Sequence, residues 1–293
     1  MTLHPFRKVV AFMFLGLFSF SCANRATTEQ AAQTTPPPPG QTSSAPTSPV
    51  PSQRLDESPR HHDWVAVPQG DRLVHSFVAF PERPDRATAV IVIHENRGLT
   101  DWERGVADQL AAAGYIAIAP DLLSGTAPGG GKTSDFASSD AAREGISKLP
   151  PQQVTADLNA VYEYVRRLPA ASGKVAVAGF CWGGSQTFRM ATNNPNLAAA
   201  FVFYGTGPDN PDAIRQIRMP VYGFYGGNDA RVNASIPKTE ALMKEAGKTY
   251  LPVKYEGAGH AYMRSGEAPD AETANRVARD QSWERWLTLL AGL

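Results

Sequence analysis

The chain has little cysteine and no excess of charge of either sign. Only Cys22 and Cys181 occur among its 293 residues. Two thiols so far apart exclude both a disulfide framework and a cysteine-rich zinc site. The 28 basic and 28 acidic side chains cancel, so the protein has no basic field that would attract a polyanion. We therefore do not expect nucleic acid as a partner.

A hydrophobic run long enough to cross a bilayer is missing near the N-terminus. The uncharged run at residues 9–20 has twelve residues, whereas a membrane-spanning helix needs ~20. The run follows Arg7 and Lys8 and precedes small residues, which is the order of a secretory signal peptide. We place this signal at residues 1–23, and the lack of an Arg-Arg pair favours the general secretory route. The sequence thus predicts an exported protein, periplasmic or lipid-anchored at the cell envelope of a bacterium.

The end of the signal can be interpreted in two ways. Ser21-Cys22 resembles a bacterial lipobox, in which the cysteine carries the lipid; cleavage after Ala23 without lipidation is the alternative. Residues 24–60 are rich in Pro, Ser and Thr, and such a segment cannot bury enough apolar surface to offset the entropy of ordering. We predict a disordered linker here. A Pro-rich spacer would hold a folded domain away from a membrane, which favours the lipoprotein.

Residues 61–293 alternate predicted strands with predicted helices. Residues 89–93 form an uninterrupted apolar, mostly β-branched run, typical of a strand buried on both faces. Residues 101–114 place apolar side chains on one helical face and end in glycine. The other strands expected are 73–80, 115–119, 175–180, 199–204, 221–226 and 253–255, and the other helices are 151–168, 183–192, 234–247 and 271–290. This order predicts one α/β domain, with a mostly parallel sheet covered by helices on both faces.

The sequence GFCWGG at residues 179–184 lies between a predicted strand and a predicted helix. This is the context of a nucleophile elbow, G-x-S-x-G, with Cys181 in place of serine. Glycines are needed there because larger side chains would collide with the neighbouring strand and helix. The turn would expose the sulfur at the carboxyl edge of the sheet, beside a helix N-terminus that favours negative charge. A buried, inert cysteine in a glycine-rich turn is the alternative.

A thiol nucleophile needs a base, and the base needs an acidic group that orients it. His260 is the only histidine after Cys181, which makes it the candidate base. Asp229 follows the strand predicted at 221–226 and is the candidate acid. Asp209 and Asp212 are the alternatives, but they follow the preceding strand.

Two backbone amides are expected to hold the oxyanion of a tetrahedral intermediate. One is the amide of Trp182, directly after the nucleophile, and the other is that of Asn96, in the loop after the strand at 89–93. His75 and His94 are predicted to be structural. We expect neither a metal nor an organic cofactor.

The cysteine elbow, Asp229, His260 and Glu95 together resemble the dienelactone hydrolase family (carboxymethylenebutenolidases), over roughly residues 71–290. The resemblance implies the α/β-hydrolase fold. It also implies that Glu95 interacts with the thiol and helps to generate thiolate when substrate binds. In this family two arginines hold a substrate carboxylate, and the matching residues are Arg264, four positions after the histidine, and Arg143, in the helical segment before the elbow.

These features predict a monomeric hydrolase that cleaves a small ester or lactone through a covalent acyl-thioester. A general carboxylesterase or thioesterase is an alternative. A tethered binding protein that keeps a hydrolase shell without catalysis is a further one.

Overall fold

The structure, a computed structural model, describes residues 55–293. The predicted signal peptide, the predicted lipidation site at Cys22 and most of the predicted linker lie outside the described residues. Residues 55–60, which the sequence assigned to the linker, pack against the folded domain. Leu55 is buried, and Arg60 forms a salt bridge with Asp108 of α2 (Asp101–Ala112). The folded unit therefore includes these residues, and the domain boundary predicted at residue 61 lies too far along the chain.

An eight-stranded sheet forms the centre of the domain, in the order β1-β2-β4-β3-β5-β6-β7-β8. The strands are β1 (His62–Gln69), β2 (Arg72–Ala79), β3 (Ala87–Ile93), β4 (Ile116–Pro120), β5 (Ala171–Phe180), β6 (Ala200–Phe203), β7 (Val221–Gly226) and β8 (Tyr250–Tyr255). Strand β2 is antiparallel to both of its neighbours, and every pairing from β4 to β8 is parallel. The mostly parallel sheet predicted from the sequence is confirmed.

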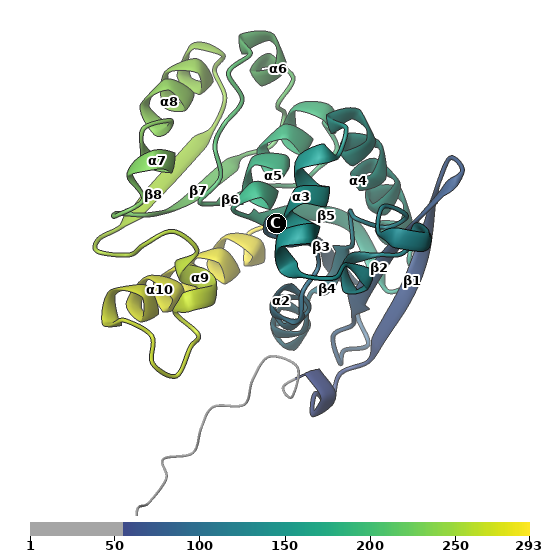
Figure 1. Ribbon diagram of the computed structural model, residues 1–293. Coiled ribbons are helices and arrows are strands. Elements are labelled where there is room, and N and C mark those ends of the chain that lie inside the picture. Colours follow the sequence, from purple (N-terminus) through teal and green to yellow (C-terminus); the bar gives the residue numbers. More distant parts are fainter. Residues whose placement is uncertain (1–54) are drawn as a thin grey trace, which may run out of the picture. The chain divides into compact units, whose positions relative to one another are not determined.

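Helices cover both faces of this sheet (Figure 1). Besides α2, the helices are α3 (Ser139–Lys148), α4 (Pro151–Val165), α5 (Trp182–Asn193), α6 (Pro211–Arg215), α7 (Ala230–Asn233), α8 (Ile236–Glu245), α9 (Tyr262–Ser265) and α10 (Thr273–Ala291). Helices α4, α5 and α8 pack in one hydrophobic cluster, and α2 and α10 pack in the other. Strand β3 contributes Ile91 and Ile93 to the first cluster and Val90 and Val92 to the second. Its uninterrupted apolar sequence follows from this burial on both faces.

The parallel strands bring the predicted site residues to one edge of the sheet. Glu95 follows β3, Cys181 follows β5, Asp229 follows β7 and His260 follows β8. Because the carboxyl ends of parallel strands meet at the same edge, residues far apart in the sequence become neighbours there.

Strand β1 and the short helices α6, α7 and α9 were not predicted from the sequence, and α3 was expected only as the helical segment that family resemblance implies around Arg143. Strand β1 is at the edge of the sheet and alternates only weakly between exposed and buried side chains. Helix α3 buries only Ala142 and Ile146. Elements with so small a buried face have little hydrophobic periodicity from which to predict them.

Asp108 anchors the start of the folded unit and provides a test of this packing. Its carboxylate accepts hydrogen bonds from Ser58 Oγ (2.6 Å), Arg60 Nε (2.7 Å) and His62 Nε2 (2.7 Å). Burial raises the pKa of Asp108, but the bonds from Arg60, Ser58 and His62 outweigh it, and the net pKa is lowered. Because the pKa of Asp108 is lower in the folded state than in the unfolded state, its ionisation stabilises the folded state at pH values above the unfolded-state pKa. This stabilisation is lost as the pH falls through the folded-state pKa.

We expect Asp108→Ala to lower the free energy of unfolding by about 1–3 kcal/mol at pH 7, because it removes charged hydrogen bonds. The difference from wild type should shrink in acid, as the wild-type carboxylate becomes protonated. Urea denaturation at neutral and acidic pH measures both effects. Glu144→Ala is the control: it breaks an exposed pair with Lys148 and should change stability little. Equal losses in the two variants would contradict this assignment.

Candidate active site

Cys181 lies on a sharp turn between β5 and α5. Its backbone has φ 56° and ψ −113°, a conformation that residues other than glycine rarely adopt. Neighbouring glycines allow the turn. A Cβ at Gly179 would lie 2.3 Å from the carbonyl oxygen of Gly183, and one at Gly184 would lie 2.5 Å from that of Phe203. The backbone is therefore that of the elbow predicted from the sequence.

Three side chains that follow different strands form a hydrogen-bonded chain at this turn. His260 Nε2 lies 3.1 Å from Cys181 Sγ, and His260 Nδ1 lies 2.5 Å from Asp229 Oδ2. Since the carboxylate can only accept, Nδ1 donates, and Nε2 of a neutral imidazole faces the thiol as an acceptor. The Asp229 side chain is 5 % exposed and that of His260 32 %. Asp209 and Asp212 instead form exposed ion pairs elsewhere.

The surroundings of Cys181 disfavour the thiolate. Burial raises its pKa, and the charge of Glu95 raises it further, whereas a hydrogen bond from the Trp182 amide lowers it; the net pKa is above the ordinary cysteine value. The site therefore favours a thiol over a thiolate at the position that faces His260 Nε2.

Glu95 is a buried carboxylate with defined partners rather than a solvated loop residue. Its Oε2 accepts from Arg264 Nε (3.0 Å), and its Oε1 accepts from the Tyr204 hydroxyl (3.2 Å). Its own amide donates to Glu103 Oε1 (3.0 Å). Burial raises the pKa of Glu95, the charge of Glu103 raises it further, and Arg264 lowers it in part. The carboxylate is thus held close to the thiol with a raised affinity for a proton.

The two amides predicted to hold an oxyanion lie on adjacent segments. Trp182 begins α5, and Asn96 lies in the turn after β3. A Cβ at Gly183 would lie 2.4 Å from the carbonyl oxygens of Ile93 and His94, so the first turn of α5 packs directly on the end of β3. Within residues 55–293, no hydrogen bond occupies the Asn96 amide. The role of the two amides stays a prediction.

The two predicted substrate-binding arginines lie in different environments. Arg264, on α9, is 43 % exposed and uses Nε to bind Glu95. Arg143, on α3, is 58 % exposed and pairs with Asp140 at 3.3 Å on the same helix. No hydrogen bond or ion pair in the described part of the chain joins Arg143 to Cys181, His260 or Glu95. Its role in substrate binding stays a prediction, without a contact to support it.

The sequence did not identify Glu103 as a member of this site, and it indicated Tyr204 only as a plausible wall of the pocket. Tyr204 directly follows β6 at the edge that also carries Cys181, and its ring packs edge-on against that of His260 at 5.1 Å. Glu103 caps the start of α2 with Thr100, and the Thr-x-x-Glu spacing of a capping box was visible in the sequence. Among the described residues other than glycine, only Cys181, Tyr204 and Ala261 have positive φ. All three adjoin the thiol–imidazole contact, where backbone strain is commonly functional.

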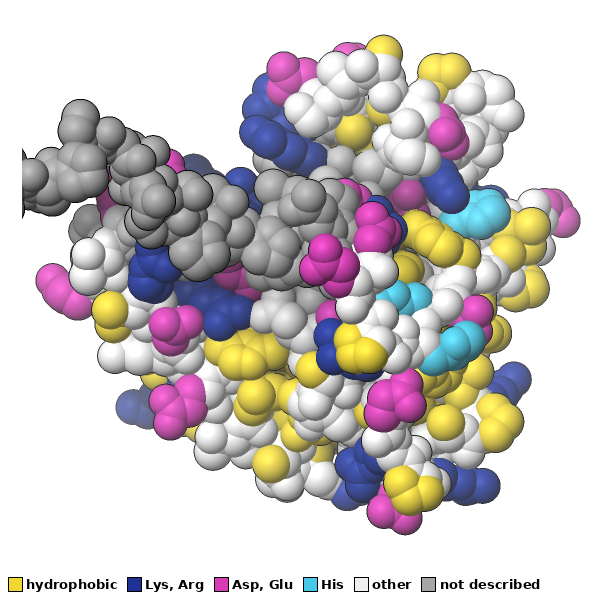
Figure 2. Space-filling model, turned by 90° about the horizontal axis from the view of Figure 1, so that it is seen from below, with side chains coloured by type: hydrophobic (Ala, Val, Ile, Leu, Met, Phe, Trp, Pro, Cys, Tyr) yellow, Lys and Arg dark blue, Asp and Glu magenta, His cyan; other side chains and the backbone are white. Residues whose placement is uncertain are grey.

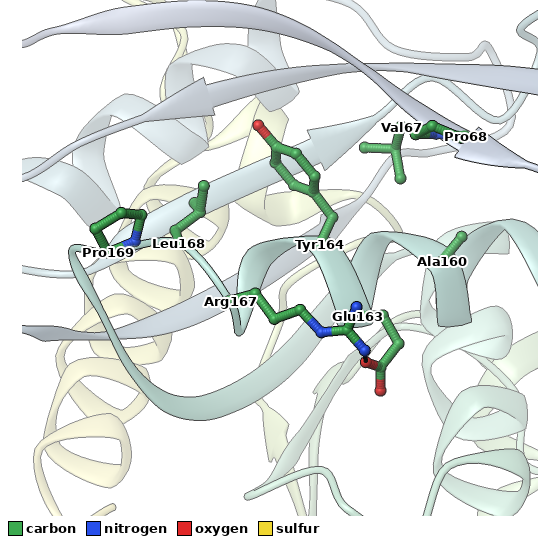
Figure 3. A pocket seen from close by; sticks show the side chains of 8 residues that line it. All are labelled: Val67, Pro68, Ala160, Glu163, Tyr164, Arg167, Leu168 and Pro169. Carbon is green, nitrogen blue, oxygen red and sulfur yellow. Dashed lines mark hydrogen bonds and ion pairs between the residues drawn. The ribbon is translucent and has the colours of Figure 1, made fainter.

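A cavity of about 390 Å³ lies elsewhere, between β1 and α4 (Figure 3). Val67 and Pro68 line it from β1, and an ion pair between Glu163 and Arg167 lies on its α4 side. It contains no member of the hydrogen-bonded chain. On the face shown in Figure 2, acidic and basic side chains are interspersed. Residues 55–293 contain no group of three His, Cys, Asp or Glu placed to hold a metal, and none of their helices is long and apolar enough to cross a bilayer.

Comparison with known proteins places this chain in a family. Residues 74–293 match the model of the dienelactone hydrolase family. A Salmonella typhimurium protein named "Putative carboxymethylenebutenolidase" is 33 % identical, over 76 % of this chain and 84 % of its own length. The carboxymethylenebutenolidase of Pseudomonas putida is 29 % identical, over 75 % of this chain and 92 % of its own length.

A solved structure shows the same fold. The crystal structure titled "Putative Dienelactone Hydrolase" from Klebsiella pneumoniae superposes with a TM-score of 0.70 and 26 % identity. The match covers 80 % of this chain and 99 % of that one. The chain therefore belongs to the dienelactone hydrolase family and is a hydrolase with the α/β-hydrolase fold.

Proposed function

We propose that this hydrolase cleaves a small ester or lactone, with Cys181 as nucleophile, His260 as general base and acid, and Asp229 as the group that orients His260. The observation that carries the proposal is the chain of contacts at 3.1 Å and 2.5 Å, which begins at a cysteine on a strand-to-helix elbow. The curated relatives, which are named for carboxymethylenebutenolidase activity, support the same class of substrate.

The first half of the reaction forms an acyl-enzyme. His260 Nε2 takes the thiol proton while Cys181 Sγ attacks the carbonyl carbon, and the C=O electron pair moves to the oxygen. The amides of Trp182 and Asn96 stabilise this oxyanion. When the carbonyl re-forms, the C–O bond to the leaving group breaks, and His260 protonates the departing alkoxide or enolate. The acyl group is left on the sulfur as a thioester.

The second half releases the acid. His260, neutral again and oriented by Asp229, takes a proton from water while the water oxygen attacks the thioester carbon. The same amides hold the second oxyanion. Its collapse breaks the C–S bond, the sulfur regains its proton from His260, and the carboxylic acid leaves. Every proton and electron pair is accounted for by substrate, water and these side chains.

Arg264 and Glu95 connect substrate binding to activation of the thiol. Arg264 is half-exposed and neutralises Glu95 through Nε. A substrate carboxylate that binds the guanidinium would compete with Glu95 for its charge. Glu95 would then attract a proton more strongly. A protonated Glu95 no longer raises the pKa of Cys181, so His260 could take the thiol proton more readily. This supports a substrate that carries a carboxylate.

Replacement of Cys181 tests the nucleophile directly. We expect Cys181→Ala to lower kcat for p-nitrophenyl acetate by a factor of the order of 10⁶, which is the loss typical of a hydrolase without its nucleophile. Cys181→Ser should retain only weak activity, because the surroundings are arranged around a thiol. Mass spectrometry of the quenched wild-type reaction should show an acetylated Cys181. Full activity of Cys181→Ala would refute the covalent route.

Replacement of Glu95 tests its effect on the thiol. Because the Glu95 charge raises the pKa of Cys181, Glu95→Gln should lower that pKa. Arg264 would then lack its carboxylate partner, and its unpaired positive charge should lower the pKa further. The rate of Cys181 alkylation by iodoacetamide, measured against pH, should then rise at lower pH than in wild type. Glu144→Gln, which changes an exposed carboxylate paired with Lys148, is the control. An unchanged profile in Glu95→Gln would contradict the coupling.

Replacement of Arg264 tests the substrate class. We expect Arg264→Gln to lower kcat/KM for a lactone that bears a carboxylate by about 10- to 100-fold, the value of a charge-assisted hydrogen bond. The methyl ester of the same lactone should lose much less. A panel of lactones, aryl esters and thioesters on wild type then separates this activity from general carboxylesterase or thioesterase activity. Equal losses for acid and ester would remove Arg264 from carboxylate recognition.

A further inference from the structure

His94 is a fully buried histidine next to the proposed catalytic residues, and its two ring nitrogens have different partners. Its Nδ1 lies 2.7 Å from the Glu95 carbonyl oxygen, and its Nε2 lies 3.3 Å from the Leu122 amide nitrogen. A carbonyl only accepts and an amide N–H only donates, so Nδ1 donates its proton and Nε2 accepts. These two bonds fit one neutral tautomer and fix the orientation of the ring.

The bond from Nδ1 fixes the orientation of the peptide that joins Glu95 to Asn96. In a planar trans peptide the C=O and the following N–H point in opposite directions, and the described residues contain no cis peptide. With the Glu95 carbonyl turned toward His94, the Asn96 N–H must point away from the ring. On the other side of Glu95, the backbone amide donates to Glu103 Oε1 at 3.0 Å. Glu95 is therefore held through both of its backbone polar groups.

The same ring also contacts the second predicted donor. The His94 imidazole stacks on the Trp182 indole, with the ring centroids 5.4 Å apart and the planes 15° from parallel. Trp182 is the residue whose amide follows the nucleophile. One buried side chain thus hydrogen-bonds to the peptide that carries the Asn96 amide and packs against the residue that carries the Trp182 amide.

We propose that His94 is a positioning residue that holds the Asn96 and Trp182 amides in the geometry of an oxyanion hole. This inference rests on the proposed function. It assigns a role to a histidine that neither exchanges protons with substrate nor contacts it. Donors aligned before the reaction stabilise a developing negative charge without reorganisation, so a donor that rotates away is lost to the transition state.

Two reactions of Cys181 separate this role from a merely structural one. Ester hydrolysis passes through a tetrahedral oxyanion, whereas alkylation by iodoacetamide displaces iodide at a saturated carbon and forms none. His94→Phe keeps an aromatic ring against Trp182 but loses the N–H that binds the Glu95 carbonyl. We expect it to lower kcat for p-nitrophenyl acetate by about 10- to 100-fold, no more than the typical effect of removing one oxyanion donor. KM and the alkylation rate of Cys181 should stay at wild-type values.

A second substitution and a control sharpen the test. His94→Gln offers an amide N–H to the Glu95 carbonyl and should recover part of the lost kcat. His62→Gln replaces a different histidine, which is partly buried and bonds to Asp108 rather than to the site, and should leave kcat unchanged. Cooperative thermal unfolding of each variant shows that it is folded. If His94→Phe does not fold, the comparison of kcat with alkylation is made on His94→Gln.

The outcomes distinguish this inference from the function on which it rests. Unchanged kcat in His94→Phe, or a parallel fall in kcat and alkylation, would overturn the positioning role and leave the Cys181 mechanism standing. Esterase activity that survives in Cys181→Ala would overturn the proposed function itself, whatever the His94 variants do.

Discussion

The contact between Cys181 Sγ and His260 Nε2 depends on a sheet whose strands run in one direction. Strands β5 and β8 are separated by β6 and β7, yet the residues that follow them meet at 3.1 Å. This is possible because every strand in that half of the sheet is parallel and ends at the same edge. The apolar sides of the helices bury both faces and so fix the sheet, and the sheet in turn fixes the distance between the sulfur and the imidazole.

The electrostatics of the site oppose ionisation of the resting thiol. Burial and the charge of Glu95 both raise the pKa of Cys181, while Arg264 holds Glu95 in its own salt bridge at 3.0 Å. A protonated thiol is a poor nucleophile and a poor target for oxidants, since the thiolate is the reactive form. Under the proposed function, a substrate carboxylate that binds Arg264 would change this balance and would couple the reactivity of the thiol to occupancy of the site.

The sequence predicted the parts of the fold that have strong periodicity or special backbone chemistry. Strand β7 begins and ends at the residues expected, and the elbow was identifiable because few other contexts place glycines around a residue between strand and helix. Arg143 shows the limit: its assignment came from family resemblance, and in the structure it pairs with Asp140 on an exposed helix face. The contact of Tyr204 with Glu95 joins segments 109 residues apart, and no local pattern encodes such a pair. Glu103 is only eight residues from Glu95, but its capping pattern does not show that it also binds the Glu95 amide.

Rigidity around the reacting atoms comes from neutral and charged hydrogen bonds that are buried, not from the proposed catalytic residues alone. Glu103 and His94 bind the backbone of Glu95 from both sides, and Tyr204 binds its side chain. Breaking any of these bonds leaves a buried polar group without a partner, which is more costly than losing an exposed bond. The loop after β3 can therefore stay in one conformation although it is not regular secondary structure. An oxyanion hole built from backbone amides requires this, because a peptide that rotates by a few tens of degrees no longer points its N–H at the charge.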